Sequence, residues 1–172
     1  MPYQLSGWSY TLQDLIHWAK GQMVELSAIM IAFNIVLLGL LFRRAFPLVI
    51  LMTGLALAFG AMLASLKILG VALNLFNILA FPLVLGIGVD YGIYIVGAMR
   101  TGSDLRRSLG SVIKPVLLSG LTTTAGFASL ALAKNPALQG LGIVCALGVA
   151  WCLFSTFFFI LPACLWRVAR HP

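Results

Sequence analysis

The chain has 172 residues, of which 62% are hydrophobic and 9% are charged. Because charged residues make up about a quarter of an ordinary soluble protein, this composition excludes a soluble domain and indicates an integral membrane protein. The formal net charge of +7 comes from cations at the ends of apolar runs and not from one continuous basic face, which argues against a nucleic-acid partner.

Five apolar runs are about 20 residues or longer, the length that a helix needs to cross about 30 Å of hydrocarbon. They predict membrane-spanning helices at residues 23–42, 45–66, 73–99, 115–133 and 137–166. The predicted fold class is therefore an all-α membrane protein, a bundle of five transmembrane helices formed by residues 23–172, with two short interfacial helices beside it.

The first interfacial helix is predicted within residues 1–22, where tryptophan and tyrosine flank a short amphipathic pattern. Thr11, with Asp14 three residues later, is typical of a capped helix start. This segment is either an interfacial helix or the carboxyl-terminal remnant of something longer. Glu25 follows at the outer edge of the first span, where we expect it to reach water and not to relay protons.

The third predicted span contains Asp90, in the run LGIGVDYGIYIVGAM. An aspartate at the centre of a membrane helix costs about 2.5 to 3.5 kcal/mol on insertion scales, so it usually faces a partner, a cavity or an ion path. Desolvation favours the neutral acid, whereas a nearby cation or an open water path favours the carboxylate. Asp90 is therefore a candidate proton carrier.

Glycines surround this acid along the same helix. Gly86 and Tyr94 share the face of Asp90, while Gly88 and Gly92 form a Gly-x-x-x-Gly pair that lets a neighbouring helix approach closely. Two turns earlier, Pro82 is expected to kink the helix.

The second interfacial helix is predicted between the third and fourth spans. Ser103 and Asp104 provide a helix start, and apolar residues then recur at helical spacing up to Ile113. The fourth span carries hydroxyl groups along one stripe, at Ser119, Thr122 and Thr123. These hydroxyls either serve Asp90 or simply bond the preceding carbonyls of their own helix.

Lysine and arginine are enriched in short cytoplasmic loops, and they gather on one side of the predicted bundle. Eight of these cations fall on one side and three on the other, at Lys20, Lys67 and Lys134. The amino terminus is therefore expected outside and the carboxyl terminus inside. The three cysteines all fall in the fifth span, without the spacing of a metal site, and are expected to pack.

Two interpretations of Asp90 stay open from the residues alone. In one it exchanges protons, and in the other it forms a permanent interhelical hydrogen bond as a neutral acid. No nucleophile with its base and orienting group, no phosphate loop and no metal cluster occurs in the sequence. We therefore expect neither an enzyme nor a cofactor.

Two segments carry a resemblance to a known family. FNILAFPLVLGIGVDYGIYIV, residues 76–96, resembles the Gly-x-x-x-Asp-Tyr helix of the resistance-nodulation-division superfamily, most closely its MMPL branch of predicted lipid and hopanoid exporters. TTTAGFASL, residues 122–130, is similar to the helix that follows that motif. The resemblance implies the last five of twelve spans, with residues 1–22 similar to the tail of a periplasmic domain.

The resemblance further implies part of a proton-motive-force-driven exporter in the bacterial inner membrane, with a hydrophobic substrate and membrane lipid as partners. Asp90 and Tyr91 would form a proton-relay pair, supported by Tyr94, Ser119, Thr122 and Thr123. A missing amino-terminal half would supply the matching pair, and a homo-oligomer stays open. The alternatives are a lipid-sensing or scaffold module without transport, and a component of the protein-export machinery with the same fold.

Overall fold

The computed structural model describes residues 21–22, 25, 28–33, 36, 39, 45–71, 77, 79–101 and 105–170. The predicted interfacial segment at residues 1–20 and most of the predicted first span lie outside these residues. The described part of the chain is helical and contains no strand. Its elements are α2 (Ala45–Ile68), α4 (Ala80–Thr101), α5 (Leu105–Leu130), α6 (Pro136–Ser155), η1 (Thr156–Ile160) and α7 (Leu161–Arg170).

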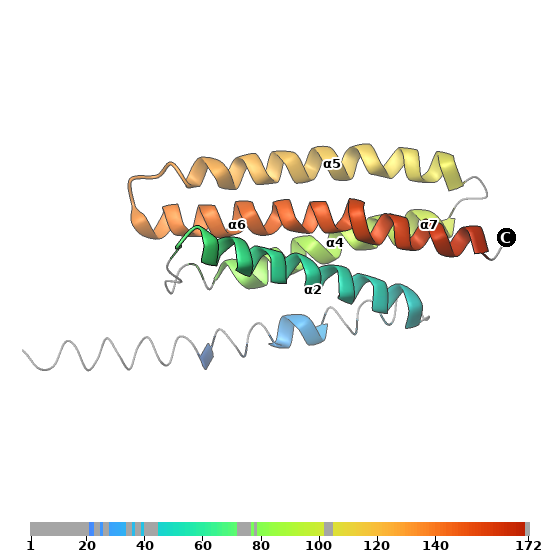
Figure 1. The fold of residues 1–172 in the computed structure, drawn as a ribbon, viewed down its shortest axis with the longest axis horizontal. Coiled ribbons are helices and arrows are strands. Elements are labelled where there is room, and N and C mark those ends of the chain that lie inside the picture. The colour runs from blue at the N-terminus through green and yellow to red at the C-terminus, as the bar shows by residue number, and fades with distance from the viewer. Residues whose placement is uncertain are drawn as a thin grey trace, which may run out of the picture.

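The central element is α6, which η1 and α7 continue into one long rod (Figure 1). It packs against α5 on one side, and α2 and α4 also contact it. The rod begins sharply because the Asn135 side chain accepts a hydrogen bond from the Ala137 N–H at 2.9 Å and Pro136 occupies the first helical position.

Close contact between helices around α6 depends on Gly148. A Cβ atom at this position would lie 2.6 Å from a Val84 methyl of α4 and 2.8 Å from the Met62 sulfur of α2. Met62, Val84, Val144 and Val149 are completely buried around it. The core of the bundle therefore lies where α2, α4 and α6 meet.

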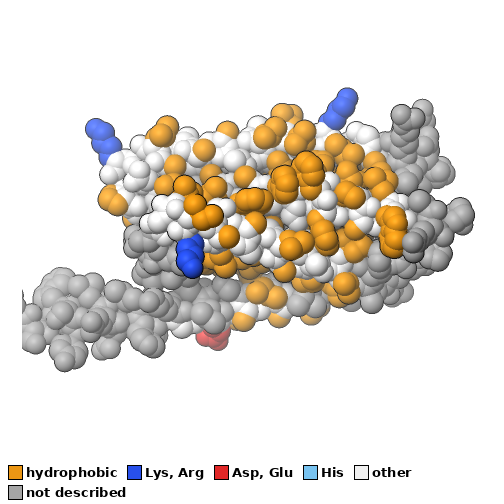
Figure 2. Space-filling model, in the orientation of Figure 1, with side chains coloured by type: hydrophobic (Ala, Val, Ile, Leu, Met, Phe, Trp, Pro, Cys, Tyr) orange, Lys and Arg blue, Asp and Glu red, His pale blue; other side chains and the backbone are white. Residues whose placement is uncertain are grey.

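Three described segments are long and apolar enough to cross a membrane, namely Leu48–Ile68, Ala80–Ala98 and Pro136–Trp166. They coincide with the predicted second, third and fifth spans. The predicted fourth span, residues 115–133, overlaps α5 but extends three residues beyond its end at Leu130. This helix is long enough to span a membrane but less apolar, because of its serines, threonines and glycines. In Figure 2 the visible face of the bundle is covered mainly by hydrophobic side chains, with lysines or arginines near its margins.

The structure corrects two predictions about element boundaries. The predicted second interfacial helix is not separate, because α5 runs without a break from Leu105 through Pro115 to Leu130. The loss of one backbone donor at Pro115 does not end the helix, since residues on both sides favour it. The third span was predicted from residue 73, but α4 begins at Ala80. Pro82 therefore lies in the first turn, where its missing N–H costs no helical hydrogen bond.

Candidate functional site

Asp90 lies midway along α4, and its side chain is exposed on one side of the helix. Leu83 and Tyr94, which share this side at helical spacing, are 43% and 61% exposed. We call Leu79, Leu83, Asp90 and Tyr94 the open face of α4. No charged side chain among the described residues acts on the Asp90 carboxyl, so the acid has no partner of opposite charge within this part of the bundle.

The opposite side of α4 is tightly packed through the predicted glycines. A Cβ atom at Gly88 would lie 2.7 Å from the Cys152 sulfur and 2.8 Å from a Leu55 methyl, and one at Gly92 would collide with Leu51. Gly86 lies nearer the open face, and its ideal Cβ position has only the Met30 methyl, at 3.6 Å, as a neighbour. Asp90 and the Gly88–Gly92 pair thus divide α4 into an open and a packed side.

Tyr91 points into the bundle and is only 5% exposed. Its hydroxyl lies beside Thr123 of α5. The geometry nevertheless falls short of a hydrogen bond, and the buried hydroxyl has no hydrogen-bond partner within the described residues. Since buried polar groups are rarely left without a partner in proteins, this hydroxyl is a candidate for a functional role.

The hydroxyl groups of α5 bond their own helix and not Asp90. Thr122 donates to the Leu118 and Ser119 carbonyls at 3.0 and 2.9 Å, and Thr123 donates to the Ser119 carbonyl at 2.8 Å. This is the self-bonding arrangement that the sequence left as an alternative. Each hydroxyl oxygen still has lone pairs, so Thr122, which is exposed, and Thr123 can accept a hydrogen bond from another group.

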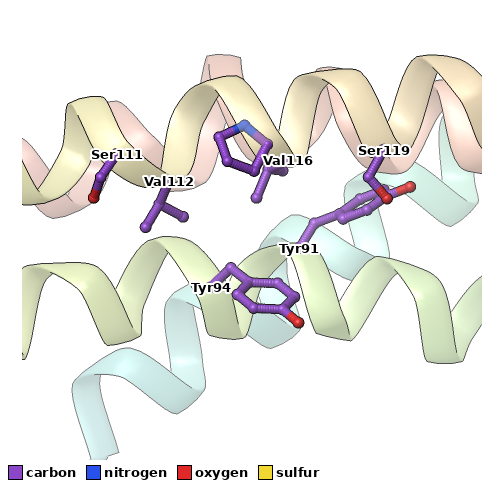
Figure 3. A pocket seen from close by; sticks show the side chains of 7 residues that line it. Tyr91, Tyr94, Ser111, Val112, Val116 and Ser119 are labelled. Atoms are coloured by element: carbon purple, nitrogen blue, oxygen red, sulfur yellow. The ribbon is translucent and has the colours of Figure 1, made fainter.

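A pocket of about 370 Å³ lies between α4 and α5. Figure 3 shows Tyr91 and Tyr94 entering it from α4, opposite Ser111, Val112, Val116 and Ser119 of α5. The structure therefore brings the predicted Tyr91, Tyr94 and Ser119 together at one groove, whereas the predicted Asp90, Thr122 and Thr123 are not among the residues that line it. Ser111, Val112, Pro115 and Val116 were missed by the sequence interpretation. The helical spacing of Ser111 and Pro115 with Ser119 is the signal that could have identified this lining.

The arrangement is suited to proton exchange at a carboxyl group. One acid at mid-membrane depth, two phenols and several hydroxyls provide groups that can donate or accept a hydrogen bond. Among the described residues, no group of three or more histidines, cysteines or acids is placed to bind a metal ion.

Comparison with known proteins shows the same likeness over nearly the whole chain. The model of the MMPL family matches residues 3–171. The hopanoid transporter HpnN of Burkholderia multivorans is 39% identical over 93 residues, and HpnN of Rhodopseudomonas palustris is 32% identical over 125 residues. The probable transport protein MmpL4 of Mycobacterium leprae is 24% identical over 159 residues.

These alignments cover 54%, 72% and 84% of the chain, but only 10%, 14% and 16% of the relatives. The chain therefore spans a small part of the length of the curated relatives that it matches. No solved structure matches the chain.

Proposed function

The chain belongs to the MMPL family, and on this premise we propose that it is part of a proton-motive-force-driven exporter of lipids or other hydrophobic molecules. It is a multi-pass protein of the inner membrane. The proposed orientation places the amino terminus outside and the carboxyl terminus inside, in keeping with the distribution of lysine and arginine.

The position of Asp90 on the open face of α4 is the observation that carries this proposal. At mid-membrane depth an exposed carboxyl would face hydrocarbon unless another protein surface or a water path covered it. Placing an aspartate at this depth costs about 2.5 to 3.5 kcal/mol. This cost is offset when a partner supplies hydrogen bonds to the carboxyl, or it is tolerated because the protein uses the ionisation of the carboxyl for its function. An acid kept solely for packing would be expected on the covered side of the helix.

The proposed partner is a second membrane half, supplied by the same or another polypeptide. The hopanoid transporters and MmpL4 are several times longer than this chain, which leaves room in them for such a half. Covering Leu83, Asp90 and Tyr94 with it would remove the carboxyl from lipid and enclose the groove beside α5. We propose further that residues 1–22 are the end of a domain outside the membrane and that residues 23–172 form the membrane domain.

In the proposed mechanism Asp90 alternates between its neutral and ionised forms. Tyr91, Tyr94 and the hydroxyls of Ser119, Thr122 and Thr123 orient the proton or the water that carries it. Each proton that crosses contributes about 2.3 kcal/mol per 100 mV of membrane potential and about 1.4 kcal/mol per unit of pH difference. This free energy drives transport only if the two forms of Asp90 favour different helix packings.

The proposed cargo is an apolar lipid. Two relatives are named hopanoid transporters, and the pocket beside Tyr94 has a mainly apolar lining with two serine hydroxyls. A lipid-sensing module without transport remains the second candidate, because an open membrane face also suits a partner protein.

The test is proton flux in proteoliposomes that contain the complete assembly and an internal pH-sensitive dye, with an imposed potassium diffusion potential. Asp90→Asn retains hydrogen-bonding capacity but cannot ionise, so we expect the flux to fall to that of empty liposomes. Glu25→Gln, which alters the acid at the outer edge of the first span, is the matched control and should retain the flux. Normal flux and assembly in Asp90→Asn would refute the proposal and favour the sensing module.

A further inference from the structure

The rod that begins with α6 contains one wide turn at the level of Asp90. In η1 the Leu161 N–H donates to the Thr156 carbonyl, five residues earlier, in the pattern of a π-helix. Cys152, Thr156, Ile160 and Cys164 all lie on the buried side, at intervals of four residues. In a regular helix of 3.6 residues per turn, the residue two turns after Cys152 is Phe159. The π-turn adds one residue to this stretch, so that Ile160 takes that position instead. Single π-turns are frequent at functional sites.

This wide turn directs Ile160 into a notch between two glycines of neighbouring helices. A Cβ atom at Gly54 of α2 would lie 2.7 Å from Cγ1 and 2.9 Å from Cδ1 of Ile160. At Gly92 of α4 the nearest side chain is Leu51 of α2, and Cδ1 of Ile160 lies farther away, 3.6 Å from the ideal Cβ position. Ile160 is 3% exposed. The Ser155 hydroxyl, one residue before η1, donates to the Gly54 carbonyl at 2.7 Å and ties the wide turn to α2.

The notch lies directly behind the open face. Gly92 follows Asp90 by two residues, and on an α-helix two residues correspond to a rotation of about 200°. A contact at Gly92 therefore acts on the side of α4 almost opposite Asp90. Any rotation of α4 that this contact allows moves the carboxyl toward α5 or away from it.

We propose that Ile160 is a positioning residue for Asp90. By filling the notch between Gly54 and Gly92, it holds α4 in the rotation that keeps the carboxyl on the open face beside Tyr94 and the groove. This inference rests on the proposed proton exchange at Asp90. It assigns to the wide turn a specific task, which is to present an isoleucine where a regular helix would present a phenylalanine.

The groups that titrate around Asp90 are few, which makes a pH profile informative. Tyr91 and Tyr94 lie on α4 itself, and Cys152 of α6 lies near Tyr91. Of the charged side chains that the structure describes on the neighbouring helices, which are Lys67 of α2 and Lys114 of α5, neither acts on the carboxyl. A change in the rotation of α4 should therefore appear as a shift in the pH dependence of Asp90.

The test uses a pair of substitutions that compensate each other. Gly54→Ala adds a methyl group where Ile160 lies, and the adjoining void of about 10 Å³ holds at most one water molecule, so Ile160 must move. Ile160→Ala empties the notch, and in the double variant the methyl group added by Gly54→Ala takes up part of the vacated space. Dye-reported proton flux in proteoliposomes of the complete assembly is measured against pH for all three variants, together with the infrared carboxyl band of Asp90.

We expect each single variant to shift the midpoint of the flux profile and of the carboxyl titration by about half a pH unit or more, and the double variant to return toward the parent. Gly142→Ala is the matched steric control, since the atoms nearest to its added methyl group would belong to Leu130 and Ala131 at the end of α5 and not to α4. It should lower the amount of assembled protein without shifting the midpoint.

Unshifted midpoints in both single variants would overturn the proposal, and so would an equal shift in Gly142→Ala. If the single variants do not assemble, Ile160→Val, which removes only Cδ1, is used in their place. An unshifted midpoint in Ile160→Val would also overturn the proposal. A failure of the proposed proton exchange can be distinguished from a failure of the role of Ile160, because it would appear as normal proton flux in Asp90→Asn. If Asp90→Asn loses proton flux but Gly54→Ala and Ile160→Ala leave the midpoint of the pH profile unchanged, only the role of Ile160 is refuted.

Discussion

The indole N–H of Trp151 in α6 donates a hydrogen bond to the Ser65 hydroxyl in α2 over 2.9 Å, and Ser65 in turn donates to the Ala61 carbonyl at 2.8 Å. This chain of two bonds joins helices whose residues are 86 positions apart in the sequence. It is partly buried, so lipid cannot supply a substitute for the lost partner.

Removing the acceptor should weaken the contact between α2 and α6. We expect Ser65→Ala to lower the free energy of unfolding in bicelles by about 0.6 kcal/mol, the typical value for hydrogen bonds between membrane helices. Ser65→Thr keeps the hydroxyl and should retain most of the stability. A double-mutant cycle with Trp151→Phe tests the pair, and full additivity of the two single effects would contradict the bond.

The start of α6 depends on the Asn135 cap. Asn135→Ala removes the acceptor for the Ala137 N–H and should cost about 1 kcal/mol of stability. Asn135→Asp and Asn135→Ser retain an acceptor at the same place and serve as controls. Unfolding of the chain in bicelles, followed by tryptophan fluorescence, measures the difference, and equal stability of the alanine and serine variants would rule out the cap.

The Tyr91 hydroxyl should matter for proton flux and not for folding. Because it is buried without a hydrogen bond in the described structure, Tyr91→Phe should keep or slightly raise the stability, within about 0.5 kcal/mol. If the hydroxyl orients a proton at Asp90, dye-reported flux should fall by at least about tenfold. Loss of stability with unchanged flux would instead mean that the hydroxyl serves packing.

The open face should be covered in the complete assembly. A photo-crosslinking amino acid in place of Leu83 or Tyr94 is expected to capture protein of the second membrane half, since both side chains are exposed on the side of Asp90. The same amino acid in place of Phe158, which is 69% exposed on η1, should capture lipid. Mass spectrometry distinguishes the products, and lipid adducts alone at all three positions would contradict a protein partner on this face.

At Gly88 the helices pack so closely that we expect no side chain to be tolerated there. Gly88→Val should destabilise the bundle by about 1 to 3 kcal/mol, because its branches would overlap Cys152 and Leu55. Gly60→Ala in α2 is the control, since its added methyl group would meet no atom within 4 Å. Thermal inactivation of assembled protein measures both, and equal effects would show that the contact is looser than described.

Much of the fold was predictable because its signals are local. Apolar runs of sufficient length identified α2, α4 and the rod from α6 to α7, the helical spacing placed Tyr94 on the side of Asp90, and the Gly88–Gly92 pair indicated a close approach of a neighbouring helix. The predicted start of the third span at residue 73 was wrong, because α4 begins at Ala80. The apolar run begins before this helix, and residue type alone does not show where within such a run the helix starts. The separate helix before Pro115 was wrong because proline removes a single hydrogen bond, which a long helix tolerates.

The amino-acid sequence by itself determined that this chain lies in a membrane and that a carboxyl group stands at the middle of one of its spans, since transfer free energy and helix length depend only on consecutive residues. Only the tertiary structure decided that Asp90 lies on an exposed side of α4, that the threonines of α5 bond their own carbonyls, and that a π-turn inserts Ile160 between two glycines. These features depend on which helix lies against which face, and that is decided by the packing of residues distant in sequence.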